Sequence, residues 1–166
     1  MIQLIESIVY LVLVSLVSGQ TNNGTKANCP FPFVSEYNGY KFNYCYYYAG
    51  ATKSFTKAFQ TCSSQYYTGI VSPKVSSGQD DLYKLYKAFS DYYFWVGAIA
   101  TAANPYDFRW RDGSLVYPAT WCQGHPKGGE NLCAFYTTTP VVGRDRCIES
   151  GPCTASFFDH GIICQY

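Results

Sequence analysis

The chain has 166 residues, a formal net charge of +1, 14% charged residues and 19% aromatic residues. This length favours a single domain, and the near-neutral charge excludes the strong basic excess expected of a nucleic-acid-binding protein. The many aromatic side chains are sufficient for a compact core.

The N-terminal segment predicts export. Residues 8–17 form an apolar run without charge, and Val17, Ser18 and Gly19 then supply small residues for cleavage. The run is shorter than the about 20 apolar residues that span a bilayer. Glu6 precedes it where a basic residue is usual, so a retained anchor and a buried strand are the alternatives. We expect a signal peptide over residues 1–19, a secreted protein, and no membrane span once the signal is removed.

A polar stretch follows, which we expect to be a flexible entry segment over residues 20–28. It contains a glycosylation acceptor at Asn23, in the triplet Asn23-Gly24-Thr25. All the cysteines lie beyond it: Cys29, Cys45, Cys62, Cys122, Cys133, Cys147, Cys153 and Cys164. An even number of cysteines in a small exported domain indicates disulfides. A zinc site is the alternative, but the sequence has no C-x-x-C pair and only two histidines, His125 and His160.

The first half of the domain predicts a hairpin and two helices. Residues 29–48 alternate aromatic and turn residues around Asn38-Gly39, which is typical of a β-hairpin. Two sets of apolar residues then have the spacing of one helical face. The first set is Phe55, Ala58, Phe59 and Cys62, with Thr52 or Ser54 as its N-cap, and the second is Leu82, Leu85, Tyr86 and Phe89, opened by a capping box at Ser77–Asp80. Asp80 and Asp81 at that helix start favour the helix dipole.

The second half predicts short strands and loops. The run "YFWVGAIA" is typical of a strand buried on both faces, and "FRWRDGSLVY" alternates before and after a turn at Asp112-Gly113. Two more strands are expected at "LCAFY" and "GIICQY". The region from Pro118 to Pro152 is otherwise rich in loops, and its cysteines indicate that it is ordered.

The order of these pieces resembles the C-type lectin-like domain over residues 29–166. The resemblance rests on "CPFPF", "YCYYY", "SFTKAFQTC", "GIVSP", "FWVGA", "FRWRDGSLVYPATW", "GENLC" and "IICQY". It implies an α+β fold in which two helices pack on small antiparallel sheets beside a long loop region tied by disulfides. It also implies the disulfides Cys29–Cys45, Cys62–Cys164 and Cys133–Cys153. Cys122 and Cys147 remain, both in the loop region, and we expect them to pair with each other.

In sugar-binding members of this family a calcium ion holds the sugar, and the resemblance places that site in the loop "GHPKGGENLC". The family's ligands are a Glu-Pro-Asn motif, a nearby Glu and an Asn-Asp pair. Pro126 and Glu130 match this pattern, whereas His125 and Lys127 replace the first Glu and Asn, and Glu149 and Ser150 replace the Asn-Asp pair. Calcium requires six to eight oxygen ligands, and Lys127 adds a repelling charge. We therefore expect no family-type calcium site and no cofactor.

The same loop region still supplies the candidate ligand contacts: His125, Lys127, Glu130, Asn131 and Glu149. For several residues we expect structural roles. His125 is expected to be an exposed loop histidine, and Glu130 to bond to loop backbone or to pair with Lys127. Trp95, Trp110 and Trp121 are expected in the core, and the "GRDR" stretch in a solvated turn.

The sequence gives no support for catalysis. It has neither a G-x-S-x-G nor an H-E-x-x-H motif, and the disulfide framework leaves no cysteine as a nucleophile. We expect a non-enzymatic, extracellular recognition module whose partner is a glycan or an extracellular protein, bound without calcium. The alternatives are a calcium-dependent lectin with an atypical site and a structural or matrix protein. The sequence leaves the oligomeric state open.

Overall fold

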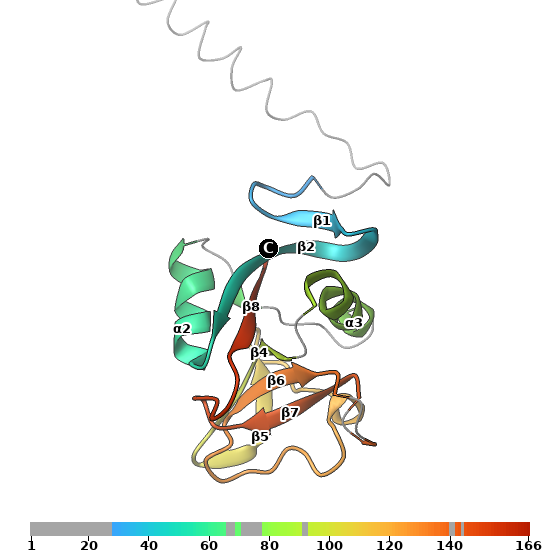
Figure 1. Ribbon diagram of the computed structural model, residues 1–166. Helices are drawn as coiled ribbons and strands as arrows, with labels where there is room; N and C mark the ends of the chain where they lie inside the picture. The colour runs from blue at the N-terminus through green and yellow to red at the C-terminus, as the bar shows by residue number, and fades with distance from the viewer. Residues whose placement is uncertain (1–27, 66–68, 71–77, 91–92, 140–141, 144) are drawn as a thin grey trace, which may run out of the picture.

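The computed structural model describes residues 28–65, 69–70, 78–90, 93–139, 142–143 and 145–166 (Figure 1). The predicted signal peptide, the glycosylation acceptor Asn23 and nearly all of the entry segment lie outside the described residues. So do Ser77, at the start of the expected capping box, and Arg144 of the "GRDR" stretch. None of the helices that the structure describes is both long and apolar enough to cross a membrane.

The described part of the chain folds into an α+β domain, as predicted. Its strands are β1 (Val34–Tyr37), β2 (Tyr40–Thr52), β3 (Gly69–Ile70), β4 (Tyr93–Thr101), β5 (Asn104–Trp110), β6 (Cys133–Thr137), β7 (Cys147–Gly151) and β8 (His160–Gln165). Its helices are α2 (Phe55–Gln60), continued by the π-helical turn η1 (Thr61–Gln65), then α3 (Gly78–Phe89) and the short 3₁₀ helix η2 (Pro118–Thr120).

The strands form two antiparallel groups joined in one sheet. β2 pairs with β1 and β8, and β8 also pairs with β3, whereas β4 pairs with β5 and β6, and β6 pairs with β7. A single parallel pairing, between Phe94 and Gly161, connects the groups. Figure 1 shows α2 and α3 on opposite sides of β2 and β8, with β5, β6 and β7 beyond them. The long loop region therefore lies at the end of the domain away from the first hairpin.

The predicted hairpin is present, and its second strand is longer than expected. Asn38 and Gly39 both have positive φ values, of 48° and 80°, as a two-residue hairpin turn of the type I′ family requires. β2 continues beyond residue 48 to Thr52 because its far half pairs with β8, where Thr52 lies opposite His160. The second and last strands of the domain, β2 and β8, therefore lie side by side.

The helix α2 has the predicted N-cap but not the whole predicted buried face. The Ser54 side chain accepts a hydrogen bond of 3.2 Å from the Lys57 backbone N–H. Phe55, Ala58 and Cys62 are buried, whereas Phe59 is 41% exposed. Phe59 therefore belongs to the predicted apolar stripe but not to the core, because the buried face is centred on Ala58 and Cys62, which leaves Phe59 at its margin.

A buried carboxylate ties α3 to β2. Asp81 is fully buried and accepts hydrogen bonds from the Asn43 backbone N–H at 2.8 Å and from the Tyr46 hydroxyl at 2.9 Å. Burial raises the pKa of this carboxyl, although its hydrogen bonds act in the opposite direction. We expected Asp81 only to interact with the helix dipole. Its side chain also reaches into the core, where it binds β2. A buried polar group needs such partners to offset its desolvation.

Two of the three tryptophans are core residues, as predicted. Trp95 is completely buried and donates from Nε1 to the Thr52 carbonyl at 3.0 Å, and Trp110 is also buried. Trp121 is only half-buried. Its ring packs edge-on against Phe108, with 4.9 Å between the ring centroids, so Trp121 lies against the core but is not enclosed by it.

Four disulfides staple the domain: Cys29–Cys45, Cys62–Cys164, Cys122–Cys147 and Cys133–Cys153. They are the four pairs expected from the resemblance and from the two cysteines that it left over. The Cys62–Cys164 bond spans 102 residues, and in the chain-entropy model a loop of this length contributes roughly 4–5 kcal/mol. The Cys122–Cys147 and Cys133–Cys153 bonds hold the long loop region to β6 and β7.

Candidate functional site

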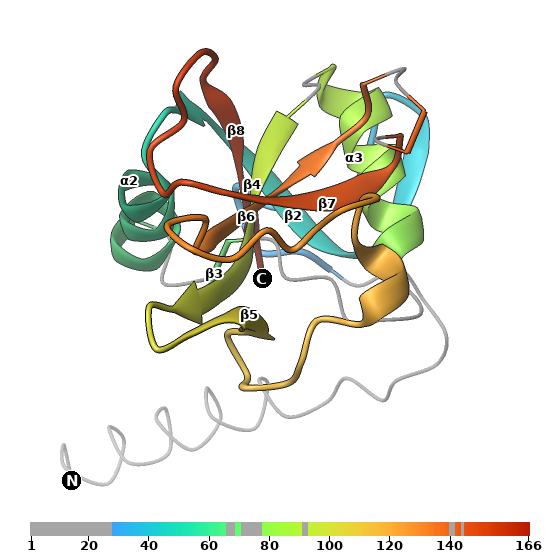
Figure 2. The same ribbon diagram turned by 90° about the horizontal axis from the view of Figure 1, so that it is seen from below.

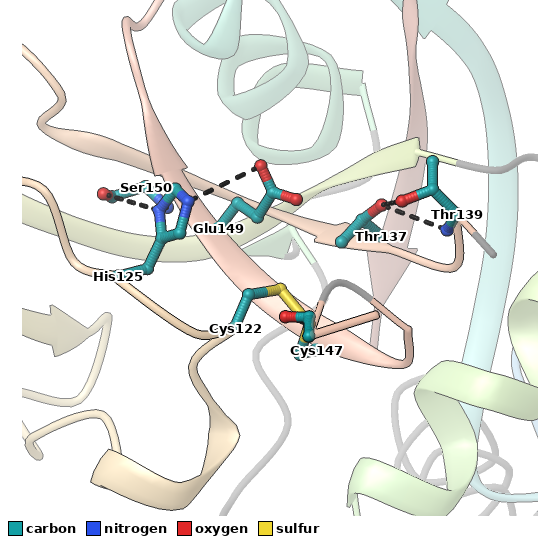
Figure 3. Close-up of a disulfide and its surroundings, with 8 residues drawn as sticks. Cys122, His125, Thr137, Thr139, Cys147, Glu149 and Ser150 are labelled. Atoms are coloured by element: carbon teal, nitrogen blue, oxygen red, sulfur yellow. Dashed lines mark hydrogen bonds and ion pairs between the residues drawn. A yellow bond between two sulfur atoms is a disulfide. The ribbon is translucent and has the colours of Figure 1, made fainter. Parts of the chain in front are cut away.

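The loop of residues 124–133 runs along the outer edge of β7. β7 is the last strand in the sheet order, so half of its backbone groups need partners from outside the sheet. The segment just before the loop supplies one of them: the Cys122 backbone N–H donates to the Ile148 carbonyl at 2.9 Å, and the Cys122–Cys147 disulfide lies beside this contact (Figure 3). The entry to the loop is therefore fixed to the strand.

His125 continues this edge contact with its side chain. Its Nδ1 accepts a hydrogen bond of 2.9 Å from the backbone N–H of Ser150, and its Nε2 lies 3.7 Å from Oε2 of Glu149 (Figure 3). Because Nδ1 is an acceptor here, the neutral ring carries its proton on Nε2, facing the carboxylate. The His125 side chain is only 5% exposed. The expectation of an exposed loop histidine is therefore wrong, because the unpaired amide of an edge strand binds the ring.

Glu149 and Ser150 are also occupied within the fold. The Glu149 side chain is only 4% exposed. The Ser150 hydroxyl accepts a hydrogen bond of 2.7 Å from the backbone N–H of Lys127. The two residues that replace the family's Asn-Asp pair thus hold the loop to β7 and do not point oxygen atoms at solvent.

The remaining candidate contacts do not converge on one site. The Asn131 side chain donates to the Gly128 carbonyl at 2.8 Å and braces the loop. Lys127 and Glu130 are exposed. Neither of the two roles expected of the Glu130 side chain is found among the described residues: it does not pair with Lys127 and does not bond to loop backbone. Of the five candidates, the structure brings only His125 and Glu149 together by their side chains.

An open groove of about 520 Å³ lies beside the loop. We call it the aromatic groove; its main lining residues are Tyr106, Leu115, Tyr117, Trp121, His125 and Pro126. Tyr106 and Tyr117 are 67% and 53% exposed, and Leu115 is exposed as well. Sequence reasoning singled out none of these three, because they lie in β5 and the segment after it and join the loop only in the folded chain.

A close approach between two segments of the chain fixes one wall of the aromatic groove. Gly128 has a φ of +69°, and a Cβ atom at this position would lie 2.5 Å from Cζ of Tyr106. The ring of Tyr106 therefore lies directly against the loop backbone, at a distance that only glycine permits. The loop thereby orients a tyrosine that is still 67% exposed, so part of its ring surface is available to a ligand.

The residues of this region do not fit a calcium ion of the family type. Calcium prefers several hard oxygen ligands, but Glu149 faces an imidazole and the Ser150 hydroxyl accepts from Lys127 N–H. Across the described ranges, no group of three or more histidine, cysteine, aspartate or glutamate side chains is placed to hold a metal ion.

Comparison with known proteins places these features in context. The family model for the lectin C-type domain matches residues 51–165. Comparison with curated proteins found no match. Among solved structures, human lithostathine is similar with a TM-score of 0.64 and 22% identity, over 90% of this chain and 98% of that one.

Two further structures show the same fold. A calcium-independent type II antifreeze protein has a TM-score of 0.62 and 21% identity, over 87% of this chain and 98% of that one. The cow C-type carbohydrate-recognition domain of CD23, solved in the presence of a GlcNAc2Man3 oligosaccharide, has a TM-score of 0.61 and 22% identity, over 83% and 95%. At these identities the likeness concerns the fold.

Proposed function

This chain belongs to the C-type lectin domain family, and from this premise we propose that it is a secreted, non-enzymatic recognition module that binds a glycan or an extracellular protein without calcium. One similar structure is titled as a carbohydrate-recognition domain with an oligosaccharide, and another as a calcium-independent protein. The family fold is thus compatible both with glycan binding and with the lack of a calcium ion.

The aromatic groove is the proposed contact surface. The observation that carries the proposal is the contrast between two neighbouring sets of side chains. His125 and Glu149, which stand at family ligand positions, are turned into the fold, whereas Tyr106 and Tyr117 are exposed beside them. Tyrosine offers an apolar ring face and a hydroxyl with few rotatable bonds, which suits extracellular recognition.

The loop residues Lys127 and Glu130 supply charges at the margin of this surface. Both are exposed, so a partner can reach their side chains without a rearrangement of the fold. In this proposal His125, Glu149 and Asn131 act indirectly, because they hold the loop in place through Ser150 and Gly128. A ligand would therefore be recognised by shape and ring contacts, with Lys127 and Glu130 adding polar contacts.

A glycan array tests the proposal. The secreted protein is applied in calcium and in chelator, and binding to the same glycans in both conditions is expected. Tyr106→Ala and Tyr117→Ala should each weaken binding about tenfold or more. Phe157→Ala is the matched control, because Phe157 is an exposed aromatic residue that does not line the groove.

Three other outcomes of this experiment would each favour a different ligand or function. Loss of all binding in chelator contradicts the calcium-independent proposal and favours an atypical calcium-dependent lectin. Absence of glycan binding in both conditions leaves an extracellular protein as the partner. Self-association without any ligand favours a structural or matrix protein.

The domain boundaries and the secretion signal belong to the same proposal. We infer that residues 1–19 are removed, that residues 20–28 link to the domain, and that Asn23 is a glycosylation acceptor. The domain is proposed to begin at Cys29 and not at the start of the family match, because the Cys29–Cys45 disulfide and the pairing of β1 with β2 join this segment to the sheet. N-terminal sequencing of the secreted protein, expected to start near Gln20, tests the cleavage.

A further inference from the structure

A second cavity, of about 510 Å³, is lined by residues of α2 and of the hairpin of β4 and β5. Figure 2 shows these two elements on the same side of the domain. We call this hollow the α2 cavity; its main lining residues are Phe55, Phe59, Ile99, Arg109, Trp110 and Arg111. It shares one lining residue, Asp107, with the aromatic groove. Its volume lies within the range typical of small-molecule sites.

The walls of the α2 cavity are apolar and partly open to water. Phe59 contributes from α2 and is 41% exposed, and Ile99 contributes from β4 and is 48% exposed. Large apolar side chains gain free energy when a ligand removes them from water. The exposure of Phe59, which departs from the helical pattern, thus coincides with a hollow that can receive an apolar group.

The rim of the cavity carries one positive charge in excess. The Arg109 guanidinium is already occupied: it donates to Oδ2 of Asp107 at 2.9 Å and to the Gly113 carbonyl at 2.9 Å. Arg111 is exposed, and its guanidinium makes neither a hydrogen bond nor an ion pair with any of the described residues. With Asp107 neutralised by Arg109, Arg111 is the charge available to a ligand, and an arginine is suited to the oxygens of an anion.

Two lining residues of the cavity each hold a buried polar atom that has no hydrogen-bond partner among the described residues. They are Nε1 of Trp110, which can only donate, and Oδ1 of Asp107, which accepts. Because both atoms are buried, the recognition of a charged ligand rests on Arg111.

We propose that the α2 cavity binds a free anionic amphiphile, with an aliphatic or aromatic body against Phe59 and Ile99 and a carboxylate or sulfonate at Arg111. The cavity is a hollow and not a protruding apolar surface, which favours a single molecule from solution over insertion into a bilayer. This site is distinct from the aromatic groove and does not depend on the function proposed for it.

The test uses two dyes of nearly the same shape. 1-Anilinonaphthalene-8-sulfonate carries the anionic group, and N-phenyl-1-naphthylamine lacks it. The folded, oxidised protein is expected to bind one molecule of the sulfonate, and decanoate is expected to displace it. Arg111→Gln should weaken sulfonate binding at least fivefold at low salt, where a single ion pair is least screened, and should change binding of the neutral dye less than twofold.

Further variants separate the cavity from a general surface effect. Phe59→Gln and Ile99→Gln should each weaken both dyes at least fivefold, and either one suffices if the other does not fold. Arg146→Gln is the matched control, because Arg146 is exposed and its guanidinium stacks on Tyr83, outside the cavity. Unchanged sulfonate binding in Arg111→Gln and Phe59→Gln would overturn the proposal. Binding to phosphatidylserine vesicles without affinity for decanoate would also overturn it.

Discussion

Nδ1 of His125 accepts a hydrogen bond from the backbone N–H of Ser150, 25 residues further along the chain, at 2.9 Å. The contact joins the loop of residues 124–133 to the edge of β7, and the other nitrogen of the ring faces Glu149. A side chain that stands at a family ligand position is therefore a structural link here. The first prediction follows from this role.

His125→Ala should lower the free energy of unfolding by about 2–4 kcal/mol, because it leaves a buried amide without an acceptor and a buried carboxylate without its neighbour. Urea denaturation of the oxidised protein measures this loss. Lys127→Gln is the control, because Lys127 contacts Ser150 through its backbone N–H alone, and it should change stability by less than about 0.5 kcal/mol. Equal stability of His125→Ala and the parent would show that the ring holds nothing in place.

Gly128 and Gly129 provide a matched pair for the wall of the aromatic groove. Both have positive φ values, of 69° and 63°, but only a Cβ at Gly128 meets the Tyr106 ring. Gly129→Ala should lose about 1–2 kcal/mol of stability from its backbone conformation. Gly128→Ala should lose about as much, because the exposed Tyr106 ring can move aside. It should also weaken binding of any ligand that contacts Tyr106, which Gly129→Ala should leave unchanged. Thermal denaturation and the array described above measure both effects, and equal ligand binding by the two variants would contradict the close contact.

The sequence was sufficient for the arrangement of elements but not for the burial of particular side chains. The spacing of Leu82 and Leu85 and the turn at Asn38-Gly39 are local signals, and both lie where they were expected. Phe59 also fits the helical spacing, but its burial depends on which elements cover α2. Spacing along the chain does not contain that information.

The candidate site was less predictable for the same reason. The loop of residues 124–133 could be identified from its motif, yet the direction of the His125 side chain depends on an amide of β7 that only the folded sheet presents. Tyr106 and Tyr117 gave no signal of their own in a chain with 17 tyrosines. They became candidates because the structure exposes both beside the loop.

Stability should fall in mild acid because of His160. This ring lies among Trp95, Phe135 and Tyr93, and burial lowers its pKa. In the unfolded chain His160 has a pKa of about 6.5. Below that pH the unfolded chain binds a proton that the folded chain does not. The contribution of His160 to the stability of the folded state is therefore complete above that pH and is lost as the pH falls through it.

The slope for one such proton is at most about 1.4 kcal/mol per pH unit. Urea denaturation between pH 7.5 and pH 5 measures it, and His160→Phe should reduce the slope. His125, the other histidine of the chain, is present in both proteins and does not affect the comparison. The same slope in both proteins would exclude His160 as its source.

The Cys122–Cys147 bond should be intramolecular and should contribute to stability. It spans 25 residues, for which the chain-entropy model gives roughly 3–4 kcal/mol. Peptide mapping without reduction should recover the two cysteines in one linked pair, and the double variant Cys122→Ser with Cys147→Ser should be less stable by about that amount. A Cys122–Cys122 link between two chains would instead indicate a covalent dimer.

Calcium should not stabilise the unmodified protein. A ligand raises stability by RT ln(1 + [L]/Kd), and the Kd should be large because Glu149 faces His125, the Ser150 hydroxyl accepts from the backbone, and Lys127 brings a positive charge to the loop. Millimolar calcium should therefore shift the melting temperature by less than about 1 °C, and chelator should leave ligand binding intact. A rise of several degrees in calcium, with loss of the ligand in chelator, would show that the loop does hold the ion.

The converse change tests the reason for this insensitivity. His125→Glu, Lys127→Asn, Glu149→Asn and Ser150→Asp together would restore the ligand types of the family pattern, remove the repelling charge and free the positions that now bind one another. The combined variant should lose stability without calcium, since the His125–Ser150 contact is gone, and should regain about 1.4 kcal/mol when calcium reaches ten times its Kd. Magnesium is the control ion, because it demands a smaller octahedral site. If the variant folds but calcium and magnesium act alike on it, the side chains of the loop are not what excludes calcium.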